Sequence, residues 1–321
     1  MELLKTLRAN SPVFPNDSSQ IFYVNKSDTI NVGFKKLIDN NILSVPVYDE
    51  SKKRFTSYLS MTDLVHEILD ITNNINLPEG DINTVLNTLT EKNLFKKDKV
   101  SDIADMSKMD PFITVESEKS LDQVLRLMVK NEISKVAVLD HNNQLCNVIC
   151  ASRIVECVSH LFGMDSELTK LGQRPVSALN IIKRDVISVK TSDKALRAFE
   201  LIAQMGISGV AVVDANDPTK IVGVISNNDL KLIKSHAQYL TLLYLPVKEY
   251  IQALKKLVVT PKDLITCKET DPFREIVEKI TGNHIHRIFV VDDNQNLRGI
   301  ITLQSILEQI VLTSQATPSS Q

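Results

Sequence analysis

Apolar and polar positions follow one order along the chain, and that order is written four times. In each copy an amphipathic helix precedes a short apolar strand that ends in an acidic residue, and a second strand and a second helix follow. The helix positions recur with a period of about 3.6 residues, and the strands are short apolar runs. A pattern of this kind predicts a repeated strand–helix–strand–strand–helix unit. The four apolar strands are Val45–Asp49, Val136–Asp140, Val210–Asp214 and Ile288–Asp292.

The repeat pattern also predicts how the chain is divided. A unit of roughly 55 residues buries too little surface to be stable alone, so we expect consecutive copies to pair. The segment Gly163–Leu179 would then divide the two pairs. In the connector between the first two copies, Val85, Leu86 and Leu89 indicate partly helical structure. The predicted segments are an N-terminal segment at 1–15, repeats at 16–72, 108–163, 180–238 and 259–314, connectors at 73–107 and 239–258, a linker at 164–179 and a polar tail at 315–321.

The junction between the second strand and the second helix carries the chemistry that differs between copies. Copy one has Ser60 followed three residues later by Asp63, and copy three has Ser226 and Asp229 in the same spacing. One interpretation is a helix N-terminal cap, because these side chains satisfy the free N–H groups of a helix start. The other is a carboxylate that accepts hydrogen bonds from the two vicinal hydroxyls of a ribose.

The other two copies do not vary as caps would. Copy two places Arg153 at the position of the acid, and copy four places Ser305 there. A cation in the first turn of a helix opposes the helix dipole, and an arginine cannot accept hydrogen bonds from a diol. Arg153 therefore indicates a cleft in which anions gather.

Composition excludes several classes of function. The chain has 321 residues, a net charge of −2 and 43% hydrophobic residues, which is typical of a globular protein without a bias toward nucleic acid. Its longest apolar stretch, near Leu240 to Val247, is far shorter than the ~20 residues of a membrane span. It opens without a secretory signal pattern, so we expect a cytoplasmic location, extended to the nucleus.

No catalytic or metal-binding signature stands in the sequence. The four cysteines form no C-x-x-C pair, and neither G-x-x-x-x-G-K nor G-x-G-x-x-G occurs. No Ser–His–Asp or H-E-x-x-H pattern is present either. We therefore expect no enzyme activity, no metal and no cofactor.

The four units resemble cystathionine-β-synthase (CBS) motifs, and their number and order resemble the gamma subunit of AMP-activated protein kinase. The resemblance covers residues 16–315 and is strongest over His286–Asp292 and Ile306–Thr313, with further similarity at 52–63. It implies an α/β fold of four CBS motifs, paired into two Bateman modules that form a flat pseudo-symmetric disc. The implied function is a non-catalytic regulatory subunit that binds AMP, ADP or ATP in clefts between CBS motifs.

The resemblance also implies roles for individual residues. Asp63 and Asp229, with Ser60 and Ser226 beside them, would hold ribose hydroxyls. The basic residues that would gather around phosphates are His286, Arg287, Lys135 and Arg153. Several family positions are changed, because Leu43, Ser134 and Ser152 stand where basic residues or a histidine are found, and Ser305 removes the fourth carboxylate. The expectation is therefore one central site built on Asp229, His286, Arg287 and Lys135.

Three hypotheses about partners remain open. In the first, nucleotide binding regulates a serine/threonine kinase catalytic subunit, joined through a linking subunit. In the second, the fold is an interaction scaffold with little or no nucleotide binding, which the changed basic positions would allow. In the third, the chain regulates another enzyme or a transporter. None of the three involves nucleic acid or a membrane as a partner.

Overall fold

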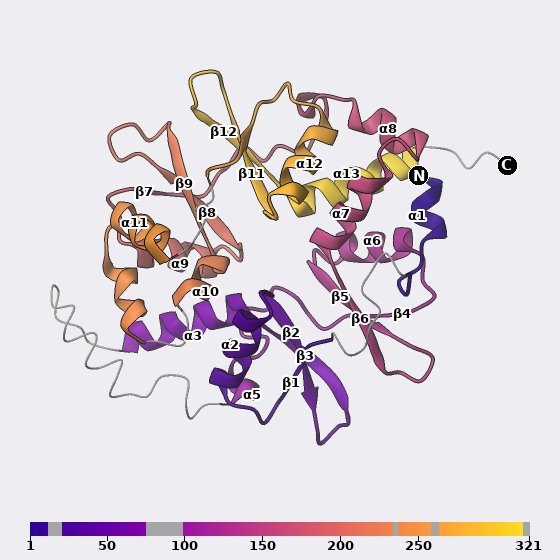
Figure 1. Cartoon of the computed structure of the whole chain (residues 1–321), viewed down its shortest axis with the longest axis horizontal. Helices are drawn as coiled ribbons and strands as arrows, with labels where there is room; N and C mark the ends of the chain where they lie inside the picture. Colours follow the sequence, from indigo (N-terminus) through magenta and orange to yellow (C-terminus); the bar gives the residue numbers. More distant parts are fainter. Residues whose placement is uncertain (12–20, 75–98, 234–236, 258–262, 317–321) are drawn as a thin grey trace. The chain divides into compact units, whose positions relative to one another are not determined.

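The repeated unit is present four times in the computed structural model, which describes residues 1–11, 21–74, 99–233, 237–257 and 263–316 (Figure 1). Each copy contains, in order, a short strand, a ten-residue helix, two longer strands and a second helix. This confirms the predicted α/β fold and the predicted order of elements. In copy three the second helix opens with a short 3-10 turn. The elements are β1 (Val24–Asn25), α2 (Ile30–Asp39), β2 (Ser44–Asp49), β3 (Arg54–Ser60) and α3 (Met61–Asn74); β4 (Thr114–Glu116), α6 (Leu121–Lys130), β5 (Lys135–Leu139), β6 (Leu145–Cys150) and α7 (Ala151–Leu161); β7 (Ser188–Lys190), α9 (Ala195–Gln204), β8 (Gly209–Val213), β9 (Ile221–Ser226), η3 (Asn227–Asp229) and α10 (Leu230–Ile233); and β10 (Thr266–Cys267), α12 (Phe273–Gly282), β11 (Arg287–Val291), β12 (Leu297–Thr302) and α13 (Leu303–Ala316).

Each copy has its own three-stranded sheet with the same topology. The sheets have the orders β1-β2-β3, β4-β5-β6, β7-β8-β9 and β10-β11-β12, and in each the first pair is parallel and the second antiparallel. The antiparallel register shifts at one equivalent position in every copy, for example between Val47 and Tyr48 and between Val138 and Leu139. Because the copies share the strand register and the place of its shift, residues at equivalent positions can be compared directly between copies.

Local sequence explains where the first helices begin and end. In copy two, Ser120 and Gln123 form a capping box at the start of α6, with Ser120 Oγ accepting from the Gln123 N–H at 3.3 Å. After each first helix the chain turns through one residue with positive φ. Because L-residues rarely adopt that conformation, only the third copy meets it without strain, with a glycine. These residues are Asn41, Glu132, Gly206 and His284, with φ of 51°, 54°, 59° and 50°.

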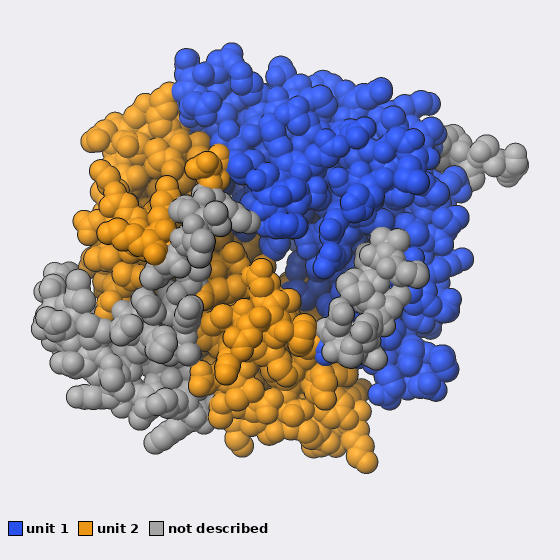
Figure 2. Space-filling model, viewed as in Figure 1, with its two compact units in different colours: residues 1–21, 112–186, 265–321 blue, residues 22–111, 187–264 orange. Residues whose placement is uncertain are grey.

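The chain forms two compact units, and neither is continuous in sequence (Figure 2). Unit 1 contains residues 1–21, 112–186 and 265–321, and unit 2 contains residues 22–111 and 187–264. Unit 1 therefore joins repeats two and four, and unit 2 joins repeats one and three. Each unit has its own hydrophobic core, built mainly from helices of its two repeats: α7 packs on α12 in unit 1, and α3 packs on α9 in unit 2.

This division corrects one expectation. We expected the segment Gly163–Leu179 to separate two pairs of repeats, but it lies wholly within unit 1. Its helix α8 (Ser166–Gly172) packs against α12 of repeat four. The aromatic rings of Phe162 and Phe273 meet there with their centroids 6.4 Å apart. The segment is apolar enough to join a core, which is why it does not act as a spacer.

Consecutive repeats are nevertheless linked, by an exchange of the short segments that precede them. We call these the lead segments: residues 7–10, 99–103, 174–178 and 246–250. In each lead segment, two successive backbone N–H groups donate to carbonyl oxygens of the turn before a first helix. That helix belongs not to the repeat that the segment precedes but to the neighbouring repeat. Thus Val100 N donates to Asp28 O at 2.8 Å in repeat one, and Ala9 N donates to Lys119 O at 2.9 Å in repeat two.

The second half of the chain repeats the exchange. The lead segment of repeat three docks on repeat four, where Val176 N donates to Asp271 O at 3.0 Å. The lead segment of repeat four docks on repeat three, where Val247 N donates to Asp193 O at 2.8 Å. Val100, Val176 and Val247 are all fully buried. Repeats one and two, and repeats three and four, therefore exchange lead segments, although each compact unit joins repeats that are not consecutive.

The remaining described elements belong to these lead segments and connectors. They are α1 (Glu2–Thr6), α5 (Val100–Ile103), η2 (Val176–Ala178), η4 (Ala237–Tyr244) and α11 (Val247–Leu257). Helix α11 lies in the second connector. The helical interpretation of Val85, Leu86 and Leu89, and most of the polar tail, lie outside the described residues. Among the described residues no helix is long and apolar enough to cross a membrane.

A close approach of two backbones makes Gly299 a sensitive position in unit 1. The residue lies in β12, beside an added bridge in which Lys183 and Ile300 exchange N–H···O bonds of 2.9 Å. A Cβ at Gly299 would overlap Ile182 Cγ2 and lie 3.0 Å from the Lys183 carbonyl oxygen. We expect Gly299→Ala to lower the free energy of unfolding of unit 1 by about 1 kcal/mol, measured by chemical denaturation.

Gly282 provides the matched control for that substitution. It ends α12 in the same unit, and a Cβ there would meet nothing within 4 Å. Gly282→Ala should leave the stability unchanged or raise it slightly, because alanine favours a helix more than glycine does. Equal effects of the two substitutions would contradict the proposed steric cause.

Candidate functional site

In every copy, one backbone bond joins the start of the second helix to the residue before the apolar strand. Its N–H···O distances lie between 2.8 and 3.2 Å. The residue that starts each strand is also the cross-strand partner of the residue that opens the junction, as in the pairs Lys135–Cys150 and Arg287–Thr302. Basic residues at strand starts therefore lie beside the junctions. The bonds run from Met61 to Leu43, Ala151 to Ser134, Asn227 to Ser208 and Leu303 to His286.

In copy one the Asp63 carboxylate accepts three hydrogen bonds from protein groups. Its Oδ2 accepts from Ser60 N at 2.8 Å and from Ser60 Oγ at 2.7 Å. Its Oδ1 accepts from Ser107 N at 2.8 Å. Asp63 is also 1% exposed. This geometry corresponds to the capping interpretation, in which the acid satisfies free N–H groups at a helix start.

Copy three repeats the cap with a more accessible acid. Asp229 Oδ2 accepts from Ser226 N at 2.6 Å and from Ser226 Oγ at 3.4 Å. Asp229 is half-buried, so its carboxylate reaches solvent more than that of Asp63. Of the two acids, Asp229 is the better placed to accept hydrogen bonds from a ligand.

Copy four keeps the geometry of the cap without the charge. Thr302 N donates to Ser305 Oγ at 2.9 Å, and Ser305 N donates to Thr302 Oγ1 at 3.2 Å. Ser305 is 2% exposed. The Ser305 hydroxyl thus accepts the backbone N–H that a carboxylate oxygen accepts at the same helix start in copies one and three. One short, buried hydroxyl offers a diol far less than a carboxylate does.

In copy two the arginine points to its own helix. Arg153 is exposed, and its Nη1 pairs with Glu156 Oε2 at 2.8 Å. The start of α7 has no side-chain cap, and Cys150 Sγ lies 3.0 Å from Ser152 Oγ. Exposed pairs one turn apart on a helix contribute little stability. Arg153 is therefore paired with a solvated partner on its own helix.

The predicted residues fall into two chemically distinct sets, one in each unit. Unit 2 holds the acids Asp63 and Asp229, with Ser44 and Gly209 at its strand starts. Unit 1 holds the basic strand starts. There Lys135 is 7% exposed, and His286 and Arg287 are half-buried. Copies with a carboxylate at the junction thus have no basic residue at the strand start, and copies with a basic residue have no carboxylate.

Sequence reasoning missed a polar cluster that joins the two junctions of unit 2. Asn227 Nδ2 donates to Thr62 Oγ1 at 2.7 Å, and both side chains are buried. Asn227 Oδ1 and the hydroxyl of Tyr250 are buried without a hydrogen-bond partner among the described residues. Burial raises the pKa of Tyr250, and the nearby Asp229 carboxylate raises it further. The junctions of copies one and three therefore meet through polar groups.

Lys231 is a further buried polar residue of copy three. It is 8% exposed, and its Nζ donates to Asn41 Oδ1 at 3.1 Å. Burial lowers the pKa of Lys231 to about 8. A comparison of the four copies could have identified Lys231, because the equivalent position holds an aliphatic residue in the other three copies. The same comparison singles out Asn227. The equivalents of Lys231 are Val65, Val155 and Leu307, and those of Asn227 are Met61, Ala151 and Leu303.

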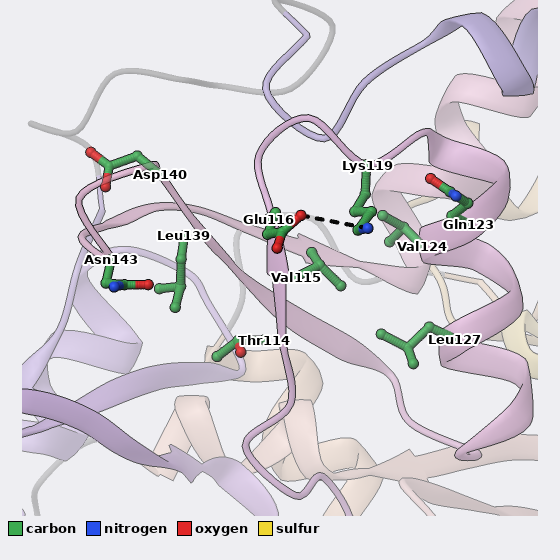
Figure 3. Close-up of a pocket in the computed structure, with 10 residues that line it drawn as sticks. All are labelled: Thr114, Val115, Glu116, Lys119, Gln123, Val124, Leu127, Leu139, Asp140 and Asn143. Carbon is green, nitrogen blue, oxygen red and sulfur yellow. Dashed lines mark ion pairs between the residues drawn. The ribbon is translucent and has the colours of Figure 1, made fainter.

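A separate hollow of about 490 Å³ lies in repeat two, and none of the predicted site residues lines it (Figure 3). It sits at the end of β5 opposite Lys135, between β4 and α6. Val115, Leu127 and Leu139 provide apolar lining, and Glu116 and Lys119 form an ion pair of 3.5 Å at its rim. Among the described residues no group of three His, Cys, Asp or Glu side chains could hold a metal ion.

The comparison with protein families identifies the repeated unit. The model of the CBS domain matches residues 17–70, 100–160, 176–234 and 255–312. These four ranges cover the four strand–helix–strand–strand–helix units. The lead segments at 100–103 and 176–178 fall inside the matched ranges.

Known proteins resemble the chain over most of its length. It is 27% identical over 238 residues to the SNF1-related protein kinase regulatory subunit gamma-1 of Arabidopsis thaliana, covering 70% of this chain and 55% of that protein. It is 25% identical over 306 residues to the 5'-AMP-activated protein kinase subunit gamma of Saccharomyces cerevisiae, covering 92% and 88%. The chain spans only about half the length of several relatives, between 50% and 58%.

A solved structure shares the fold. It is that of a protein from Methanocaldococcus jannaschii that has been proposed as an archaeal homologue of g-AMPK. The TM-score is 0.69, with 19% sequence identity, and the match covers 92% of this chain and 98% of that one. At this identity the likeness concerns the fold.

Proposed function

The chain belongs to the CBS domain family, and on that premise we propose that it is a non-catalytic regulatory subunit that binds adenine nucleotides. Its four CBS motifs resemble AMP-activated protein kinase gamma subunits along 92% of its length, at identities of 23% to 25%. In this proposal AMP, ADP or ATP binds at the repeat junctions, and the chain regulates a serine/threonine protein kinase. A ligand that binds one arrangement of the repeats more tightly shifts the population toward it, and a partner responds to that shift.

The observation that carries the proposal is the chemistry of the junctions. Two junctions retain a serine followed three residues later by an aspartate, which suits the vicinal hydroxyls of a ribose. Two strand starts retain basic residues, Lys135 and Arg287, the latter preceded by His286. Arginine and lysine supply the charge-assisted bonds that phosphates require. A nucleoside phosphate is the class of small molecule that needs both sets.

Within this proposal Asp229 of unit 2 is the residue assigned to a ribose, and Lys135, His286 and Arg287 of unit 1 are the residues assigned to phosphates. Asp229 is preferred over Asp63 because it is half-buried rather than fully buried and Asp63 already accepts three hydrogen bonds. The positions of Arg153 and Ser305 should hold no ribose. We therefore expect at most two nucleotides per chain.

The helix caps described above favour a second candidate function. In it the chain is an interaction scaffold with little or no nucleotide binding. Asp63 and Ser305 are both engaged in closing the start of their own helices. Leu43, Ser134 and Ser152 also reduce the positive charge at the junctions of copies one and two. The two candidates differ in one measurable property, the affinity for adenine nucleotides.

Isothermal titration of the full chain with AMP, ADP and ATP separates the two candidates. The proposed function requires saturable binding of at least one adenylate, with a stoichiometry of two or less. The absence of heat with all three nucleotides favours the scaffold. A ligand-bound structure with ribose at Arg153 or Ser305 would refute the assignment of the sites.

We expect Asp229→Asn to weaken the binding of adenine nucleotide by about 1–2 kcal/mol, roughly tenfold in Kd. The asparagine Oδ1 can still accept from Ser226 N, so the helix start stays capped while the charge that holds the ribose is lost. Calorimetric titration measures the effect.

Asp102→Asn is the control for that variant, because Asp102 also caps a helix in unit 2, accepting from Lys99 N at 2.9 Å, away from the junctions. The Asp102 carboxylate is exposed, so its replacement changes no buried charge. The nucleotide affinity of Asp102→Asn should stay at the wild-type value. An Asp229→Asn protein that titrates like the wild type would remove Asp229 from the site.

The kinase part of the proposal is tested in the native cell. Affinity purification of the tagged chain should recover a serine/threonine kinase catalytic subunit together with a linking subunit. Recovery with a transporter or a metabolic enzyme would instead make the chain a regulator of that protein. Loss of nucleotide binding in Asp229→Asn without loss of the kinase would show that the two properties are separable.

A further inference from the structure

One corner of repeat one differs from the same corner in the other three repeats. The corner lies where the first strand, the end of the second strand and the start of the third meet. Strand register identifies the equivalent positions, and only repeat one has aromatic residues there. Because three copies build the corner without rings, the rings are not needed for the fold. The residues are Tyr23, Tyr48 and Phe55 in repeat one, Thr114, Leu139 and Leu145 in repeat two, Ser188, Val213 and Ile221 in repeat three, and Thr266, Val291 and Leu297 in repeat four.

The three rings form one cluster, in which Tyr23 is exposed and Tyr48 and Phe55 are half-buried. We call Tyr23, Tyr48 and Phe55 the aromatic corner. Their ring centroids are 6.2, 5.5 and 5.2 Å apart, in edge-to-face geometry. The Nζ of Lys36 lies 5.7 Å from the centre of the Tyr23 ring. Tyr23 is 43% exposed and the neighbouring Phe22 is 39% exposed.

A basic hairpin tip leads directly into this corner. Lys52, Lys53 and Arg54 are exposed and immediately precede Phe55. Within the part of the chain that the structure describes, their side chains form no ion pair. The acids of the same hairpin have other partners, because Asp49 pairs with Lys26 at 3.1 Å and Glu50 accepts from Ser27. The tip thus carries three positive charges that the hairpin itself does not neutralise.

Repeat two shows the same place without either feature. There the corner is the hollow of about 490 Å³, lined by Thr114 and Leu139 where repeat one has tyrosines (Figure 3). Leu127 takes the place of Lys36, and Asp140 and Asn143 belong to a turn without lysine or arginine. The comparison separates what the fold requires from what repeat one adds, namely a partly exposed aromatic cluster, a cation and a basic tip.

We propose that the aromatic corner and the basic tip of repeat one form a docking surface for an acidic segment of a partner protein. Exposed aromatic clusters are unusual on a protein surface and are enriched at interfaces. The rings would pack against an apolar side chain of the segment. Lys52, Lys53 and Arg54 would meet its carboxylates, which fixes the register and raises the association rate. This surface is independent of the junctions and goes beyond the proposed nucleotide binding.

The first test uses the full chain and a fluorescent acidic peptide with phenylalanine at its centre, measured by fluorescence polarisation. The triple variant Tyr23→Thr, Tyr48→Leu, Phe55→Leu gives repeat one the residues with which repeat two already folds. We expect it to keep the wild-type melting temperature and to lose at least about tenfold in affinity. Unchanged affinity would overturn the proposal.

The second test addresses the charge. Lys52→Gln, Lys53→Gln, Arg54→Gln should weaken binding about tenfold and reduce its dependence on salt. The control replaces Lys194, Lys220 and Lys248, which belong to the same unit, by Gln and should bind as the wild type does. Equal loss in the control would show a general charge effect and overturn the proposal.

Two further ligands test the chemistry of the occupant. An acidic peptide without phenylalanine should bind at least about tenfold more weakly than the parent peptide, because the rings then gain no apolar partner. An oligonucleotide or an anionic vesicle that displaces the peptide at equal charge concentration would overturn the assignment to a protein segment.

Discussion

Val176→Asp should unfold part of repeat four while leaving repeat three intact, although Val176 immediately precedes repeat three in sequence. Val176 is fully buried, and its N–H donates to Asp271 O at 3.0 Å in the turn before α12. An aspartate there would place an unpaired charge in the core of unit 1. The expected loss of stability is about 3–5 kcal/mol.

Hydrogen exchange followed by mass spectrometry locates the effect. Amide protection should fall in α12 (Phe273–Gly282) and stay unchanged in α9 (Ala195–Gln204). Ser177→Asp is the control, because Ser177 is the next residue, is exposed and carries the same change in charge. Faster exchange in α9 rather than in α12 would contradict the exchange of lead segments.

Lys231→Met should stabilise unit 2 at neutral pH by about 2 kcal/mol. The folded protein holds the Lys231 amine in a poorly solvated position, which lowers its pKa from 10.5 to about 8. Each tenfold change in proton affinity corresponds to about 1.4 kcal/mol, and the amine is partly screened because it reaches the exposed Asn41. Methionine keeps the shape of the side chain and removes the charge.

The advantage of Lys231→Met should depend on pH in a defined direction. Below pH 8 the amine is protonated in both states, and the folded state bears the full cost of the buried charge. Between pH 8 and 10.5 the unfolded state binds the proton more tightly, so the wild-type protein gains stability as the pH rises. Chemical denaturation at pH 7 and pH 10 should therefore show the difference shrinking.

Lys248 supplies the control for this measurement, since it is an exposed lysine of the same unit. Lys248→Met should leave the free energy of unfolding within about 0.5 kcal/mol of the wild type at both pH values. A Lys231→Met protein that is less stable than the wild type at pH 7 would mean that the Lys231–Asn41 bond outweighs the cost of burial.

The order of elements could be predicted because each is specified by its own local pattern. Helices α2, α6, α9 and α12 have apolar residues at helical spacing, and the strands that follow are continuous apolar runs. The grouping of repeats into units could not be predicted in the same way. It depends on which helix faces meet, such as α7 with α12, and sequence spacing carries no record of that choice.

The lead segments illustrate a second kind of information that is missing from sequence. Their docking uses backbone N–H groups, as in the bond from Val247 N to Asp193 O. Any residue other than proline can donate such a bond, so no side chain marks the partner. Only the buried valines at 100, 176 and 247 hint that these segments join a core.

The junctions were predictable in type but not in detail. The spacing of Ser60 and Asp63 identified both the cap and the ribose interpretation, and the structure finds the cap in place. The contact of Asn227 with Thr62 was missed because the residues are far apart in sequence and each looks ordinary by itself. Comparing copies position by position would have found Asn227 and Lys231, since both replace aliphatic residues.

The discontinuity of the two units has a consequence for how the chain folds as it leaves the ribosome. Unit 1 contains residues 1–21 but also residues 265–321, whereas the last segment of unit 2 ends at residue 264. During synthesis unit 2 is therefore the first to have all its parts. Repeat two must wait with an exposed apolar surface until α12 and α13 are made. Nascent chains stalled before residue 265 should accordingly bind chaperones through α6 and α7.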